Sequence, residues 1–180
     1  SNDMEKPSGS RAIYATLLTP QGKFLHDFFI SALDGTLLFD CEAARIDDLE
    51  RRLAFYRLRA DAKIENWSER FRVFALICDD GSAAESITGG VVYADPRLAA
   101  MGARAVLPHK NAVAALEAAG FCPAPPADYE RLRLRHGLPA GSRDLLIDKG
   151  LLLENGIDHL PGADFGKGCY TGPDPPPRPP

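Results

Sequence analysis

Residues 12–41 read AIYATLLTPQGKFLHDFFISALDGTLLFDC. Three apolar runs in this stretch are separated by two turn signals, Thr19–Gly22 and the dipeptide Asp34-Gly35. An Asp-Gly pair between apolar runs is the strongest short-range signal for a hairpin, because both residues tolerate a positive φ. We therefore expect an antiparallel meander with strands at residues 12–18, 24–30 and 36–41.

Helical and strand-like periodicities alternate after the meander. Ile46, Leu49 and Leu53 recur at steps of three and four between residues 44 and 58, which is typical of an amphipathic helix. Further strands are expected at residues 62–67, 71–78, 90–93 and 103–107, and further helices at residues 111–119 and 129–136, the last capped by Asp128. The chain after residue 137 is rich in loop residues. This order predicts an α+β fold in which helices pack on one face of antiparallel sheets.

The composition is that of an ordinary globular protein. Of the 180 residues, 45% are hydrophobic and 26% are charged, and the formal net charge is −4. This balance argues against a nucleic-acid partner, since such surfaces need a local excess of Lys and Arg. No apolar stretch approaches the ~20 residues that span a bilayer, and no signal peptide is recognisable. We therefore expect a cytoplasmic protein without a membrane partner.

The C-terminal residues differ from the rest of the chain. Six of the last nine residues are prolines, which lack the backbone donor that helices and sheets need. We therefore divide the chain into a folded region at residues 1–172 and a proline-rich tail at residues 173–180, which we expect to be disordered or polyproline-like.

The segment Lys167-Gly168-Cys169-Tyr170 has the clearest chemical potential. An ammonium group near Cys169 favours the thiolate, which is the nucleophilic and metal-binding form of cysteine. The alternative is an exposed thiol without a function. Cys41 and Cys78 follow apolar runs and are expected to be small core residues. No CxxC pair or histidine spacing indicates a metal site, and no glycine-rich phosphate loop indicates a nucleotide.

Two arginines, Arg57 and Arg59, end the predicted helix. They lie about 200° apart around an ideal helix, so both face one ligand only if the helix frays there. The alternative is that they are solvated cations that interact favourably with the helix dipole.

Six segments, in order and at compatible spacings, resemble motifs of the YgfZ family, which is related to the T protein of the glycine cleavage system and to a mitochondrial iron–sulfur assembly factor. They are Leu17–Lys23 (LLTPQGK), Tyr56–Arg59 (YRLR), Asp95–Leu98 (DPRL) with Gly102–Arg104, Tyr129–Arg133 (YERLR) with Gly137–Pro139, Leu152–Glu154, and Asp164–Gly172 (DFGKGCYTG). The ordered set covers most of residues 12–172 and is more specific than any one of its members.

The resemblance implies a T-protein-like fold around a cavity of the size of tetrahydrofolate. It also implies a role in the maturation or repair of iron–sulfur proteins, with Cys169 as the functional thiol. Arg57, Arg59, Lys167 and Tyr170 would line or support the cavity, and arginines suit the negatively charged glutamate tail of a folate. The implied partners are a folate-type small molecule and iron–sulfur client or assembly proteins.

The chain departs from the family pattern at its ends. Pro173 and Asp174 stand where Gln and Glu are expected after the motif, and the family's flanking segments have no counterpart, so we expect a fragment truncated at both ends. Whether the protein is an enzyme stays open. One alternative is a folate-dependent aminomethyl- or methyl-transferase like the T protein, although no carboxylate is found to anchor the pterin. Another is an inactive remnant.

Overall fold

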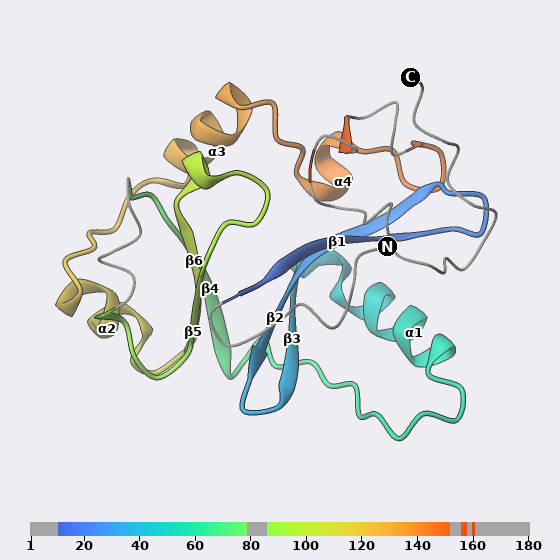
Figure 1. The fold of residues 1–180 in the computed structure, drawn as a ribbon, viewed down its shortest axis with the longest axis horizontal. Helices are drawn as coiled ribbons and strands as arrows, with labels where there is room; N and C mark the ends of the chain where they lie inside the picture. The colour runs from blue at the N-terminus through green and yellow to red at the C-terminus, as the bar shows by residue number, and fades with distance from the viewer. Residues whose placement is uncertain (1–10, 79–85, 152–155, 158–159, 161–180) are drawn as a thin grey trace.

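The computed structural model describes residues 11–78, 86–151, 156, 157 and 160 (Figure 1). Its first sheet is the predicted meander, with β1 (Ile13–Leu18), β2 (Phe24–Leu33) and β3 (Thr36–Cys41) paired antiparallel in that order. Asp34 and Gly35 both have positive φ, 48° and 77°, and place Leu33 opposite Thr36. The hairpin signal thus fixes the register of β2 against β3.

A second antiparallel sheet has the order β4-β6-β5 and contains β4 (Phe71–Leu76), β5 (Val91–Ala94) and β6 (Ala103–Pro108). All three strands were expected from the sequence. The strand expected at residues 62–67 is wrong, because this segment pairs with no neighbour and is mostly exposed. Trp67 instead stacks on Phe71, with ring centroids 5.7 Å apart.

Four α-helices occur in the described residues: α1 (Ile46–Tyr56), α2 (Ala112–Ala118), α3 (Pro126–Arg135) and α4 (Gly141–Asp144). Short 3-10 helices span Ala43–Arg45 and Ala99–Met101. The predicted cap at Asp128 is wrong, since α3 begins at Pro126, a residue favoured at the first helical position, and Asp128 lies inside the first turn. The short helix α4 lies where a loop was expected.

The elements form four layers, with the two sheets facing each other. Tyr14 and Phe29 of the first sheet pack against Val91, Tyr93 and Val106 of the second. Figure 1 shows α1 and α2 on opposite sides of this pair of sheets. The outer face of the first sheet packs against α1, and that of the second against α2. Each sheet therefore carries a helix on one face, as predicted, and buries the other face against its partner.

None of the helices in the described parts of the chain combines the length and the apolar character needed to cross a membrane.

Candidate functional site

A buried ion pair lies where β5 ends. Arg97 donates from Nε to Oδ1 of Asp95 at 3.0 Å and from Nη2 to Oδ2 at 2.6 Å. The same Oδ1 accepts the backbone N–H of Arg97 at 2.9 Å. The two side chains are only 4% and 1% exposed. This bidentate contact fixes the plane of the guanidinium group between the sheets.

Aromatic rings surround Arg97. Its guanidinium carbon lies 4.7 Å from the ring centroid of Phe29 and 5.8 Å from that of Tyr14. Its Nη2 also donates to the Tyr129 hydroxyl of α3 at 3.0 Å. Burial alone would lower the pKa of Arg97, but Asp95 and Tyr129 raise it above its ordinary value. A permanently charged group thus joins β2, β5 and α3.

A second ion pair connects the two sheets. Arg104 of β6 donates from Nε to Oδ2 of Asp40 on β3 at 3.0 Å, and also from Nη2 to the same oxygen. Its guanidinium carbon lies 4.1 Å from the Phe29 ring centroid. Beside it, burial raises the pKa of Tyr93, an effect that Arg104 partly offsets. The Tyr93 hydroxyl nevertheless lacks a hydrogen bond of acceptable geometry within the described residues.

Asp27 of β2 is the titratable group best suited to bind a ligand on this inner face. Its Oδ2 accepts a hydrogen bond from the Tyr14 hydroxyl at 2.9 Å, and its side chain is only partly exposed. Burial raises the pKa of Asp27, although the bonds from Tyr14 and the Gly141 backbone lower it in part. Carboxyl groups with perturbed pKa values are frequent at functional sites.

The first residues of α4 close around Asp27. Gly141 has a φ of +50°, and a Cβ there would lie 3.1 Å from Oδ1 of Asp27 and 2.9 Å from Oε2 of Glu42. Ser142 donates its hydroxyl to Oε1 of Glu42 at 2.7 Å. Glycine is favoured at position 141 because of its positive φ, and a side chain there would also press on both carboxylates. Sequence reasoning missed Asp27, although a charged residue inside the apolar run FLHDFFI was the available signal.

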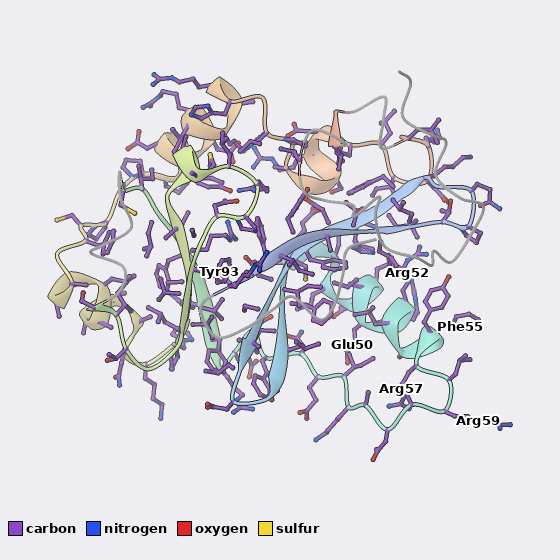
Figure 2. All side chains as sticks on the ribbon, viewed as in Figure 1. Glu50, Arg52, Phe55, Arg57, Arg59 and Tyr93 are labelled. Carbon is purple, nitrogen blue, oxygen red and sulfur yellow. The ribbon has the colours of Figure 1, made fainter. Side chains whose placement is uncertain are left out.

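The predicted site residues divide into two groups. Cys169, Lys167 and Tyr170 lie outside the described residues. Arg57 and Arg59 are exposed where α1 ends, as Figure 2 shows, and Nη1 of Arg57 donates to the carbonyl of residue 62 at 3.2 Å. Their proposed contact with a folate stays a prediction.

Strand alternation separates these arginines from Asp27. His26 of β2 contacts α1 through a 2.8 Å hydrogen bond between its Nε2 and Oδ2 of Asp48. Because neighbouring side chains of a strand point to opposite faces, Asp27 lies on the face turned away from α1. The structure therefore does not bring Arg57 and Arg59 together with Asp27.

The three described thiols differ in their exposure. Cys41 and Cys78 pack at the margins of the core, as predicted, though both are only half-buried. Burial and the nearby Asp40 carboxylate raise the pKa of Cys41 to about 11. Cys122 is exposed. No group of three or more His, Cys, Asp or Glu side chains in the described part of the chain is arranged to hold a metal ion.

The relatives of this chain that follow are iron–sulfur cluster assembly factors. The human mitochondrial iron–sulfur cluster assembly factor IBA57 is 32% identical, over 92% of this chain and 49% of the human protein. The homologue from Mycosarcoma maydis is 30% identical, over 89% of this chain and 40% of its own length. The mouse factor is 28% identical, over 91% and 48%. No protein-family model matches the chain.

The homologues of this chain are thus IBA57 iron–sulfur cluster assembly factors, and the chain spans less than half of the length of each of the three. The names of these relatives place them in mitochondria. The prediction of a cytoplasmic protein is therefore wrong; it depended on the lack of a recognisable signal in the sequence.

Proposed function

We propose that this chain acts in iron–sulfur cluster assembly and binds a reduced folate through Asp27 as it does so. The assembly role is supported by its similarity to the human factor, at 32% identity along 92% of this chain. That similarity is the observation that carries the proposal. Iron–sulfur client or assembly proteins are the corresponding partners, and Cys169 of the KGCYTG segment is the proposed functional thiol.

The folate part of the proposal is supported by the chemistry of Asp27. The pterin of tetrahydrofolate has adjacent N–H donors along one edge, and a carboxylate can accept two such bonds at once. Asp27 is partly exposed, and the Tyr14 hydroxyl orients one of its oxygens at 2.9 Å. Asp27 also accepts a bond from the Gly141 backbone, so a pterin would use the lone pairs that the Tyr14 and Gly141 bonds leave open on the carboxylate. These residues fit the pterin end of a folate.

Calorimetric titration with 5-formyltetrahydrofolate, a stable reduced folate, tests this assignment. We expect saturable binding by the full chain and at least about tenfold weaker binding by Asp27→Asn, because the amide replaces one acceptor by a donor. Asp61→Asn is the matched control, since Asp61 is exposed in the segment after α1. Equal affinities of the two variants, or no saturable heat from the folded chain, would refute folate binding at Asp27.

The assembly role is tested in human cells depleted of their IBA57 factor. The chain, targeted to mitochondria, is expected to restore the activity of a mitochondrial enzyme that holds a [4Fe–4S] cluster. We expect Cys169→Ser to abolish the rescue and Cys122→Ser, which changes an exposed thiol, to retain it. Rescue by Cys169→Ser equal to that by the unchanged chain would rule out the thiol role, and the absence of any rescue would rule out this function for the chain.

Asp27 also favours a second candidate, the transfer of a one-carbon unit to a folate. The objection to a transferase was the lack of a carboxylate near the pterin, and a partly buried carboxyl with a raised pKa is suited to hold or move a proton there. Formation of 5,10-methylenetetrahydrofolate from an aminomethyl donor, lost in Asp27→Asn, would support this function. Folate binding without turnover favours the assembly role alone, and failure of both activities favours an inactive remnant.

A further inference from the structure

The end of α1 exposes apolar side chains that a helix in contact with a sheet normally buries. Leu49, on the sheet-facing side of α1, is 3% exposed, whereas Phe55 is 76%, Tyr56 52% and Leu58 85% exposed. The rings of Phe55 and Tyr56 meet edge to face, with centroids 5.5 Å apart. We call residues 55–59 the α1 tip. Exposed apolar groups that gather in this way, unlike scattered ones, mark interaction surfaces.

Leu58 also has an unfavourable backbone conformation. Its φ is +48°, in the left-handed region where helices usually place glycine after their last turn. A leucine Cβ clashes with the backbone in this region. The side chain is 85% exposed, so packing within the described fold does not compensate for the strain. Strained backbone conformations cluster at functional sites, which makes this position a candidate for one.

Two cations flank Leu58. Arg57 donates to the carbonyl of Ala62 at 3.2 Å, and Arg59 makes no hydrogen bond or ion pair with any other described residue. The next cation along the chain, Lys63, is already paired with Glu65 at 2.8 Å. The α1 tip therefore carries both exposed apolar side chains and two arginines, and Figure 2 labels Phe55, Arg57 and Arg59 where α1 ends.

We propose that the α1 tip is a docking surface for a protein segment that presents Asp or Glu side chains beside apolar ones. Aromatic residues and arginine are enriched at the centres of such interfaces, and each guanidinium can bind a carboxylate through two parallel hydrogen bonds. An anionic membrane is the weaker fit, because stable attachment needs a larger basic cluster than two arginines.

This surface lies on the α1 side of the first sheet, and Asp27 faces the other way. A partner at the α1 tip and a ligand at Asp27 would not compete for space. The inference goes beyond the proposed function and does not depend on folate binding, so its failure would leave that function in place.

A peptide library displayed on phage tests the proposal. Peptides are selected against the full chain, and synthetic copies of the enriched ones are titrated against it by fluorescence anisotropy. We expect them to combine Asp or Glu with Leu, Ile or Phe. Binding should weaken at least about tenfold in Leu58→Gly and in the double variant Arg57→Glu/Arg59→Glu. Leu134→Ala, which shortens a 62% exposed leucine on α3, should bind as well as the unchanged chain.

Leu58→Gly should also change Tm. A structural role for this leucine would make the change a decrease, whereas the proposal predicts an increase. Because glycine adopts a positive φ without a clash, the variant should raise Tm by about 2–4 °C while it weakens peptide binding. Phe55→Ser provides an independent test of binding at a position where the backbone is helical.

Several outcomes would overturn the proposal. They are enriched peptides without acidic residues, equal loss of binding in Leu134→Ala, and a lower Tm in Leu58→Gly. A chain dimer that Leu58→Gly dissociates would assign the surface to a second copy. Binding to phosphatidylserine vesicles that the same variants abolish would assign it to a membrane. Loss of 5-formyltetrahydrofolate binding, but not of peptide binding, in the double arginine variant would assign these arginines to the folate.

Discussion

At the scale of single residues, the Asp27 carboxyl group opposes folding at neutral pH. Its pKa is raised, mainly by burial, so the folded chain holds the proton more tightly than the unfolded chain does. Stability contributed by such a group is present at low pH and is lost as the pH rises through its folded pKa. We predict that Asp27→Asn increases the free energy of unfolding at pH 7 by about 1 kcal/mol.

Urea unfolding at pH 7 and at pH 3.5 measures this effect. The gain from Asp27→Asn should shrink at the lower pH, where the carboxyl is mostly protonated in the unfolded chain as well, and Asp61→Asn should show no gain at either pH. A variant that is less stable than the unchanged chain at pH 7 would mean that the ionised carboxylate of Asp27 supports the fold.

The thiol of Cys41 gives a second prediction at this scale. With a pKa of about 11, raised by burial and by Asp40, it holds almost no thiolate at pH 7.5. Peptide mapping after brief exposure to a maleimide should show Cys122, which is exposed, labelled at least about tenfold faster than Cys41. Equal labelling rates of the two cysteines would contradict both the burial of the Cys41 thiol and its raised pKa.

The candidate site residues were selected from the sequence by their chemical type. Their burial depends on contacts with distant parts of the chain, so only the structure reveals it. Arg57 and Arg59 were chosen as adjacent cations, but they lie on the exposed end of a helix. Arg97 was recognisable only as part of a DPRL segment, although it is 4% exposed and bound to Asp95. Asp27 escaped notice because its burial depends on α4, which contacts it from more than a hundred residues away in the sequence.

At the scale of elements, a charged cluster attaches α1 to the first sheet. Asp48 of α1 accepts bonds from His26 and from Nε of Arg52, each at 2.8 Å, and pairs with Arg51. These contacts lower the pKa of Asp48, while burial lowers that of His26. We predict that Asp48→Asn decreases the free energy of unfolding by about 2 kcal/mol at pH 7, because charge-assisted bonds are lost.

Both shifts give the same dependence on pH. The lowered pKa of Asp48 means that its contribution is present above about pH 4 and is lost as the pH falls through the folded pKa. The lowered pKa of His26 means that the unfolded chain takes up a proton first, below about pH 6.5. The difference in free energy of unfolding between the unchanged chain and Asp48→Asn, measured by urea unfolding at pH 7, 5 and 3, should therefore shrink as the pH falls.

The neighbouring residue Asp47 gives the control for this element. Asp47 is exposed in the same helical turn, so Asp47→Asn should cost less than about 1 kcal/mol, the usual size of a charge–dipole interaction. If Asp47→Asn costs as much as Asp48→Asn, the bond to His26 has no specific role in holding α1 to the sheet.

Short sequence signals predicted an element correctly where neighbouring residues alone determine it. Thr36–Cys41 has the predicted bounds because a two-residue turn fixes where its strand begins. Residues 62–67 have a strand-like composition but no partner strand, so pairing, a non-local condition, is missing there. The helix α4 starts at a glycine with positive φ, and no helical periodicity in four residues could indicate it.

At the scale of the whole molecule, periodicity identified the strands but not their division between two sheets. The alternation that gives each strand a buried face is the same whether that face meets a helix or another sheet. The inner layer is also charged, since the guanidinium groups of Arg97 and Arg104 both lie over the Phe29 ring, and hydrophobic patterning alone places no such residues in a core.

The Asp40–Arg104 pair gives the last prediction, because it joins the two sheets directly. Burial alone would lower the pKa of Arg104, but the Asp40 carboxylate beside it raises it above its ordinary value. Their side chains are 13% and 11% exposed. We predict that Arg104→Met decreases the free energy of unfolding by about 3–5 kcal/mol, because it leaves the Asp40 charge unpaired.

The double variant Asp40→Leu/Arg104→Met separates the attraction of the pair from the cost of leaving one charge alone. Its inner layer is apolar on both sides, so most of the lost stability should return. Urea unfolding followed by circular dichroism and by Trp67 fluorescence measures both quantities, since Trp67 borders the second sheet. If the double variant remains as unstable as Arg104→Met, the contacts of the Arg104 guanidinium with the Phe29 ring, rather than its charge, hold the two sheets together.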